Sequence, residues 1–472
     1  MNTRKPKIGV LLLCPPRFHD LGEGTIHGTY DERKKIVSED ILKHFDYADV
    51  VYPGLVYTKE DMEKTILLFK EKEVDMVFAH FLSWSDDFAW VRFLRDCNDI
   101  PMVYATIIRD HLGFENSFTE DTFIEFLAAG GIVGSLEGSG DLRRFHREKV
   151  LNLVGLASDV FAKTKTFAKA CALRGELRHN QIALLPSYNE AMWSTYIHPY
   201  DVFMKVGPEL RFLTIAELLE VIDTISEEEC KKATKEILSK YIIKGTIDEE
   251  KMNASVRGSL ALEKIARKYN CELLILNDID KALMRNVGLR PGFTPCPGTD
   301  DILVTPEGDI GAGLACYFLK KLTGQHVSFI EPFYVDHDKH TFHAGHAGPN
   351  DYTDPEGKTI VATDTRFAKS NFRYAGAPFA NHLFAPGEKT MCFVGEKDGK
   401  FRIVATIVDA LESEHFLDGY SHGLFKTRIP EEEFFAKLID IGVTQHYGIT
   451  KGNHLEELKD LALVLGFDYY EI

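Results

Sequence analysis

The first 110 residues alternate between continuous apolar runs and segments in which apolar residues have helical spacing. A continuous apolar run is typical of a strand covered on both faces, as in a parallel sheet. The pattern predicts strands at 7–14, 48–54, 74–82 and 101–107, and helices at 30–46, 59–72 and 86–97. This order predicts a parallel, doubly wound sheet at the start of the chain.

The alternation continues in the middle of the chain and changes toward its end. The pattern predicts helices at about 141–174, 225–241 and 250–270, and strands at 181–187 and 271–278. Two β-rich runs within 390–411 flank Lys397-Asp398-Gly399-Lys400, which is a hairpin signal, and a last helix is predicted at 453–465. The expected fold class is therefore α/β, with two Rossmann-like parallel-sheet units followed by a β-rich, barrel-like C-terminal domain. The expected domains are 1–177, 178–325 and 326–472.

Charge and composition exclude several kinds of partner. Acidic residues outnumber basic ones by 72 to 55, which gives a formal net charge of −17. Such a charge repels phosphate backbones and anionic membrane surfaces, so nucleic acid is not an expected partner. No window of about 18 apolar residues occurs, so no membrane span is expected.

The N-terminus and the cysteines indicate a cytoplasmic protein. The first apolar run is short and is followed by Pro15, Pro16 and Arg17, which favours a buried strand over a signal peptide. The eight cysteines are scattered, without a CxxC pair, as reduced and buried thiols would be.

Acidic residues and histidines gather between glycines and prolines in the segment 296–354. Glu307 precedes an amphipathic helix expected at about 309–322, and Glu331 ends the apolar run VSFIE. Histidines follow at 337, 340, 343 and 346. Carboxylates combined with imidazoles suit Mn²⁺, and also Co²⁺ or Mg²⁺, whereas the absence of thiolates disfavours a structural zinc site. A carboxylate pair at a metal also suits proton transfer beside a carbonyl group.

Spacing alone leaves other interpretations open. The histidines also fit a solvated loop, no HExxH motif occurs, and the spacing does not separate isomerisation from hydrolysis. Asp336 and Asp338 could orient a ligand or simply be solvated. The glycines at 22, 24 and 28 have GxGxxxG spacing, which fits a substrate-side loop better than a dinucleotide fingerprint.

The sequence around these residues resembles the L-arabinose isomerase branch of the L-arabinose/L-fucose isomerase family. The resemblance lies in P-E-G-D-I-G-A-G with Glu307, S-F-I-E-P-F with Glu331, A-G-H-A-G with His346 and Q-H-Y-G-I-T with His446. The segment from Val74 to Ile107 resembles that family's third strand, helix and fourth strand. The family's glutamine- and histidine-bearing segment after the fourth strand corresponds to 135–144, which contains no histidine.

The resemblance implies a Mn²⁺-dependent aldose–ketose isomerase that acts through an ene-diol. Glu307 and Glu331 would be metal ligands and the acid/base pair, and His346 and His446 would complete the metal site. His343 is an alternative ligand or a substrate contact, and His19 is expected to contact the sugar. The resemblance also implies three domains and a homotrimer or homohexamer with shared active sites. A sugar-binding homologue without turnover and a metal-dependent hydrolase are the alternatives.

Overall fold

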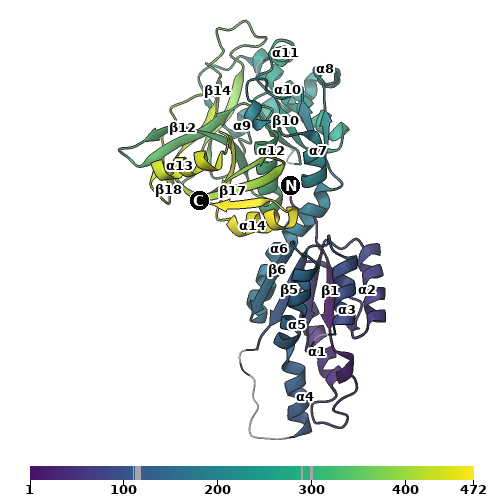
Figure 1. Ribbon diagram of the computed structural model, residues 1–472. Helices are drawn as coiled ribbons and strands as arrows, with labels where there is room; N and C mark the ends of the chain where they lie inside the picture. Colours follow the sequence, from purple (N-terminus) through teal and green to yellow (C-terminus); the bar gives the residue numbers. More distant parts are fainter. Residues whose placement is uncertain (85, 110, 112–118, 289–290, 298–300) are drawn as a thin grey trace. The chain divides into compact units, whose positions relative to one another are not determined.

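The structure is a computed structural model that describes residues 1–472 apart from 85, 110, 112–118, 289–290 and 298–300 (Figure 1). The chain forms two compact units. One comprises Thr3–Glu176 with Leu463–Gly466. The other comprises Met1–Asn2, Leu177–Ala462 and Phe467–Ile472, so it holds both the central and the C-terminal segments of the chain.

The N-terminal unit is a parallel sheet with helices on both faces. The strand order is β2-β1-β4-β5-β6, and the short β3 also pairs with β1. On one face Phe45, which follows α1, contacts Phe161 of α6, whereas Trp90 lies in the core cluster that includes α2 and α3 on the other. The strands are β1 Lys7–Leu13, β2 Asp49–Val51, β3 Leu55–Val56, β4 Met76–Phe81, β5 Met102–Ile107 and β6 Val150–Gly155. The helices are α1 Tyr30–Lys43, α2 Lys59–Glu71, α3 Asp87–Asp96, α4 Glu120–Ala129, α5 Gly131–Arg144 and α6 Ala157–Leu177.

The helix predicted at 141–174 is wrong in its first part. Strand β6 interrupts it and pairs with β5, from Met102 opposite Val150 to Ile107 opposite Gly155. Helix α5 ends before His146, which has a φ of 51°. Within β6 only Leu153 is buried, so this edge strand lacks the continuous apolar run by which the other strands were predicted. Pairing with β5 overrides the local pattern here.

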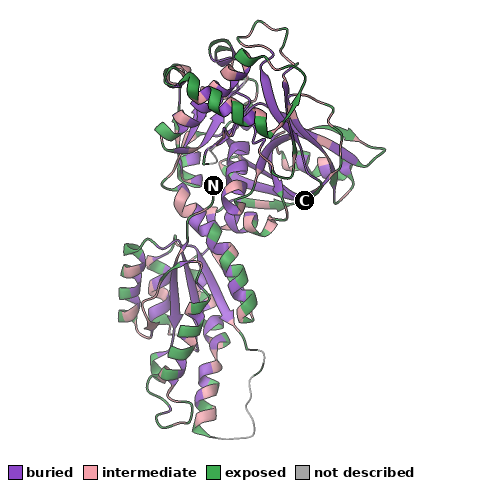
Figure 2. Ribbon diagram, turned by 180° about the vertical axis from the view of Figure 1, so that it is seen from behind, coloured by how far each residue is buried: buried purple, intermediate pink, exposed green. Residues whose placement is uncertain are grey.

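The central segment forms a second parallel sheet, with the order β11-β10-β7-β8. Its strands are β7 Gln181–Leu185, β8 Glu209–Phe212, β10 Cys271–Leu276 and β11 Leu303–Thr305. Its helices are α7 Pro199–Asp201, α8 Ile215–Asp223, α9 Glu227–Lys240, α10 Glu249–Lys268, α11 Lys281–Asn286 and α12 Ile310–Thr323. Figure 2 shows that the strands are mostly buried, whereas helices at the surface carry exposed residues.

The C-terminal segment closes into an antiparallel barrel. The sheet order is β20-β17-β16-β19-β12-β13-β18-β15-β14-β9, and the additional pairing of β17 with β18 closes the ring. The strands are β9 Ile242–Lys244, β12 Val327–Asp336, β13 Thr341–Ala347, β14 Lys358–Thr363, β15 Pro378–Leu383, β16 Gly387–Lys397, β17 Lys400–Leu411, β18 Tyr420–Thr427, β19 Tyr447–Lys451 and β20 Asp468–Glu471, with helices α13 Glu431–Ile441 and α14 Leu455–Leu465. The predicted hairpin turn is present, because Lys397 pairs with Lys400 across Asp398 and Gly399, both of positive φ. The predicted fold class is thus confirmed.

Helix α12 lies between the central sheet and the barrel. It contacts β10 and β11 on one side and β12, β16 and β19 on the other, and nearly all of its residues are buried. Glycines permit this close packing: a Cβ added at Gly311 would lie 2.2 Å from the Val394 carbonyl oxygen, and one at Gly448 would lie 3.0 Å from the Cys316 nitrogen. The N-terminus of α12 is therefore held against the barrel wall.

The substitution Gly311→Ala is expected to lower the free energy of unfolding by about 1–3 kcal/mol, because the new methyl group collides with backbone that cannot move aside. The control is Gly140→Ala in α5, where no atom lies within 4 Å of the added Cβ. There the loss of backbone entropy in the unfolded chain should stabilise the protein by about 0.5–1 kcal/mol. Urea unfolding followed by circular dichroism measures both. Equal stabilisation by the two substitutions would contradict the packing of α12.

None of the described helices combines the length and apolar character needed to cross a membrane. All eight cysteines are buried.

Candidate metal centre

Glu307 stands in a sharp turn between β11 and α12. Both Glu307 and Gly308 have positive φ, at 68° and 69°. The Glu307 amide donates to Asp278 Oδ1 at 2.9 Å, and Asn189 Nδ2 donates to Glu307 Oε2 at 3.2 Å. A left-handed non-glycine residue costs about 1–3 kcal/mol, and such residues concentrate at functional sites. The turn also places the carboxylate at the N-terminus of α12, where the helix dipole favours negative charge.

The other three predicted residues lie on adjoining strands of the barrel or, for His446, directly before one. Ile330 of β12 pairs with Tyr447 of β19, so the neighbouring residues Glu331 and His446 come side by side. Glu331 itself pairs with Gly345 of β13, which precedes His346. Strand β12 continues to Asp336, so Glu331 lies inside the strand, next to a register shift, and not at the strand end that the sequence predicted.

The structure brings all four side chains together. His346 Nε2 lies 3.8 Å from Glu307 Oε1, and His446 Nε2 lies 3.9 Å from Glu331 Oε2. Ligand atoms of Glu331, His346 and His446 lie within 4.8 Å of one another. The histidine side chains are almost fully buried, whereas Glu307 is 13% and Glu331 29% exposed. The site is therefore open to solvent on its carboxylate side.

Hydrogen bonds fix both imidazoles in the tautomer that suits a metal ligand. His346 Nδ1 bonds to the Ala347 carbonyl oxygen, and His446 Nδ1 lies 3.0 Å from Asp309 Oδ2. Because a carbonyl or carboxylate oxygen can only accept, each Nδ1 carries the proton. Each neutral ring therefore turns the lone pair of its Nε2 toward a glutamate. Phe329 packs against both rings, with centroid distances of 4.8 and 4.7 Å, and holds their orientation.

A lone pair facing a carboxylate is repulsive unless a proton or a cation lies between them. The pKa of His446 reflects this arrangement: burial lowers it, but the hydrogen bond that the ring donates to Asp309 and the charges of Asp309, Glu307 and Glu331 outweigh burial and raise it above 6.5. Cis ligands of an octahedral ion with bonds of about 2.1 Å lie about 3 Å apart, so small movements from 3.8–3.9 Å would close the site on a cation. The donor set of two carboxylates and two imidazoles fits Mn²⁺, Co²⁺ or Mg²⁺.

Asp309 orients His446, and the sequence analysis missed it. The sequence analysis considered Asp336 and Asp338 for this role, but Asp336 instead accepts a hydrogen bond from the Lys339 amide at 3.1 Å. Asp309 is buried and caps α12, because its Oδ1 accepts from the Ala312 amide at 3.0 Å. Its position directly before an apolar helical run is a capping signal, but only the fold brings it to His446. No local signal pointed to Asn189.

Neither residue predicted to contact a sugar belongs to this group of four: His343 points away from it, and His19 lies in the other compact unit. His343 is three residues before His346 on β13, so its side chain points to the opposite face of the strand, where it meets Tyr334 and Phe416. His19 belongs to the N-terminal unit and lies 3.1 Å from Asp31 Oδ1, with Asp20 beside it. This group is exposed, as is the cluster of His337 with Glu432, so water competes with any ion there.

Asp309→Asn is expected to weaken Mn²⁺ binding by about 10–100-fold, which is the usual cost of losing a partner that orients a metal-ligating histidine. One amide oxygen cannot both cap α12 and accept from His446. The matched control is Asp336→Asn, which alters a carboxylate bonded only to its own turn and should leave the affinity unchanged. Calorimetric titration of metal-free protein with Mn²⁺ measures both, and equal affinities would contradict the role of Asp309.

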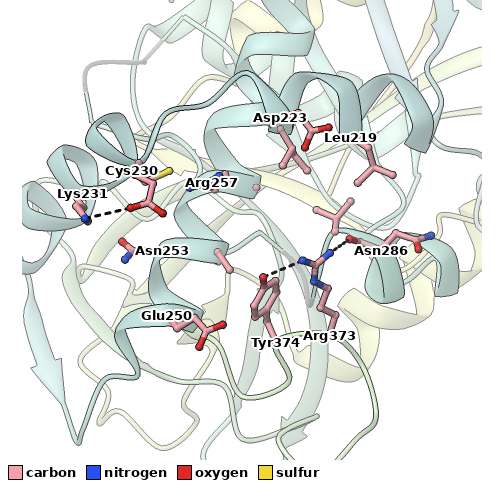
Figure 3. Close-up of a pocket in the computed structure, with 15 residues that line it drawn as sticks. Leu219, Asp223, Cys230, Lys231, Glu250, Asn253, Arg257, Asn286, Arg373 and Tyr374 are labelled. Atoms are coloured by element: carbon pink, nitrogen blue, oxygen red, sulfur yellow. Dashed lines mark hydrogen bonds and ion pairs between the residues drawn. The ribbon is translucent and has the colours of Figure 1, made fainter.

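A separate cavity of about 410 Å³ lies between the helices of the central segment and the chain near Arg373 (Figure 3). Its lining mixes charges: Lys231 pairs with Glu227, and Arg373 donates to the Asn286 carbonyl and to the Tyr374 hydroxyl. No histidine is among the described residues that line it. This cavity therefore offers no comparable set of metal ligands.

Two comparisons with known proteins found no match. No family model matches this chain, and no curated protein matches it.

Proposed function

We propose that this protein is a metal-dependent aldose–ketose isomerase with its active site at Glu307, Glu331, His346 and His446. One observation carries the proposal: two imidazoles with fixed tautomers turn their Nε2 lone pairs toward two carboxylates at 3.8 and 3.9 Å. Such an arrangement is repulsive unless a proton or a cation lies between each ring and its carboxylate. The mixed O/N donor set favours Mn²⁺, with Co²⁺ or Mg²⁺ as substitutes.

The two glutamates supply the proton transfer. Bound at this site, a divalent cation would polarise the carbonyl and hydroxyl oxygens at C1 and C2 of a sugar. One ionised glutamate removes the C2 proton of the aldose. The C–H electron pair forms the C1–C2 double bond, and the former carbonyl oxygen O1 takes up a proton to give the ene-diol. A proton then adds to C1 while O2 loses its proton and becomes the carbonyl oxygen of the ketose, so protons and electrons balance and no oxidant is needed. Because the two carboxylates interact, they titrate as a pair, and the roles of base and acid are not assigned to one glutamate or the other.

The sequence context supports the same assignment. Each of the four residues stands in a segment that resembles its counterpart in the L-arabinose/L-fucose isomerase family, and the four are spread over 140 residues. In that family, residues of a neighbouring subunit complete the active site. We therefore include in the proposal a homo-oligomer, with the N-terminal unit contributing to sugar recognition, and a pentose, hexose or deoxy sugar as substrate.

The test is hydrogen exchange in deuterated water. Metal-free protein is supplied with Mn²⁺ and incubated with a panel of pentoses, hexoses and 6-deoxy sugars, and deuterium at C1 and C2 is measured by NMR. Incorporation of deuterium at either carbon supports isomerisation, provided that no incorporation occurs when EDTA is present. Release of a leaving group without exchange would instead identify a hydrolase. Sugar binding without exchange would identify a binding protein.

A further inference from the structure

A second group of metal-ligating side chains lies elsewhere in the same unit. Ligand atoms of His326, Asp354 and His382 lie within 4.8 Å of one another. His326 directly precedes β12, Asp354 lies between β13 and β14, and His382 is on β15. His326 is five residues before Glu331, or about 16 Å along an extended chain, so the two groups share no ligand.

The ring of His326 is oriented like that of a metal ligand. Its Nε2 lies 2.8 Å from the carbonyl oxygen of Asp351, which can only accept, so Nε2 carries the proton. In this tautomer the lone pair of the ring is on Nδ1. The His326 carbonyl oxygen also accepts from Thr450 Oγ1 at 2.7 Å, which fixes the backbone at this position. A ligating histidine commonly donates its other ring N–H to a carbonyl in this way.

His382 presents a buried nitrogen that the described residues leave unsatisfied. Its side chain is fully buried, and its Nδ1 has no hydrogen-bond partner among the described residues. Its Nε2 lies 3.4 Å from Ser328 Oγ, and its ring stands edge-on to that of His326 at 5.2 Å. Burial lowers the pKa of His382 well below 6.5, so the ring stays neutral and keeps a lone pair. A buried nitrogen without a hydrogen bond is unfavourable, and a metal bond would remove that penalty.

Asp354 supplies a carboxylate at the edge of a cavity. One of its oxygens accepts from the Glu356 amide at 2.9 Å, which orients the side chain. Asp354 and His326 both line a cavity of about 530 Å³, which leaves room for water or another ligand. Lys389 lines the same cavity, and its positive charge opposes a cation there. Burial lowers the pKa of Lys389, so it releases its proton more readily than an exposed lysine.

We propose that His326, His382 and Asp354 form a second divalent-metal site of the Zn²⁺ type, with an open coordination position toward the cavity. Two imidazoles and one carboxylate favour a late first-row ion, whereas the carboxylate-richer first site favours Mn²⁺. The ion would fasten a weakly attached part of the sheet: β15 joins β18 through one paired position, Leu383 opposite His422. Its ligands would tie β15 to the start of β12 and to the chain before β14.

The test is Zn²⁺ titration of the full chain, stripped of metal, against a chromophoric chelator. The double variant Glu307→Gln/Glu331→Gln removes the carboxylates of the first site and leaves the second intact. We expect it to bind one equivalent of Zn²⁺. Adding His382→Gln or Asp354→Asn should weaken this binding by at least about 100-fold, because losing a ligand costs more than losing a partner that orients one. Lys389→Gln should tighten it, because it removes the opposing charge.

The matched control is His454→Gln in the same double variant, since His454 lines the same cavity but is not one of the three ligands. It should still bind one equivalent. Hydrogen–deuterium exchange gives a second measurement: Zn²⁺ should slow amide exchange in β14 and β15 of the double variant and have no such effect after His382→Gln. Absence of Zn²⁺ binding in the folded double variant, or binding that persists with both His382→Gln and Asp354→Asn, would overturn the second site. Neither result bears on the isomerase, whose activity is measured separately with the first site intact.

Discussion

Glu331→Gln is expected to lower kcat for sugar isomerisation by about 10³-fold and to leave the fold intact. Glutamine has nearly the same shape as glutamate but cannot accept a proton, and a positioned acid–base group contributes about 10²–10⁴-fold to a rate. Glu331 is partly exposed on a barrel strand and faces His446 at 3.9 Å, so the substitution disturbs no packed core. The loss of one negative charge should also weaken metal binding, so the rate must be compared at saturating Mn²⁺.

The control for this experiment is Glu432→Gln, the same substitution on the outer surface of α13. Glu432 is 61% exposed and pairs with the exposed His337, so its loss should leave kcat within about twofold of the original value. Circular dichroism and thermal unfolding check that both variants are folded. A Glu331→Gln variant with unreduced kcat would contradict the acid–base assignment, whatever the metal content.

The sequence predicted the strands and helices correctly where their burial gives a simple pattern of apolar residues. Strands such as β4, which are buried along their whole length, appear as continuous apolar runs and were predicted within two residues of their bounds. The edge strand β6 buries only Leu153 and lies where the sequence predicted a helix. The pairing of β9 with β14 joins residues more than 100 positions apart, and no local pattern could predict it.

The candidate site was accessible to sequence reasoning only in part, for a related reason. Each of the four predicted ligands stands in a distinctive short segment, so each segment could be singled out. The residues that orient them could not: Asp309 reaches His446 across the interface between α12 and the barrel, and Asn189 reaches Glu307 from the loop after β7. The second site could not be predicted from local sequence, because His326, Asp354 and His382 lie in three separate segments that only the folded sheet brings together.

Removing divalent metal is expected to abolish isomerisation, and Mn²⁺ should restore it with a pH dependence set by His446. Metal and proton compete for His446 Nε2, since Nδ1 is held by Asp309. The pKa of this ring lies above 6.5, so Mn²⁺ affinity should fall by about tenfold per pH unit below that pKa, and the loss should begin at a higher pH than for an ordinary histidine. Calorimetric titrations at a series of pH values measure this slope.

Unfolding measurements test the same proton linkage. As pH rises, the His446 contribution to the stability of the metal-free protein falls, whereas Mn²⁺ affinity rises. A raised pKa means that protonated His446 stabilises the metal-free fold at low pH, and this contribution is lost as pH rises through the raised pKa. Mn²⁺ at 100 times its dissociation constant should add about 2.7 kcal/mol to the free energy of unfolding. At a fixed Mn²⁺ concentration, the Tm difference between metal-loaded and metal-free protein should therefore widen as pH rises. His446→Gln should remove both the widening and most of the difference, whereas His454→Gln should retain them; a Tm difference that is independent of pH would contradict His446 as a ligand.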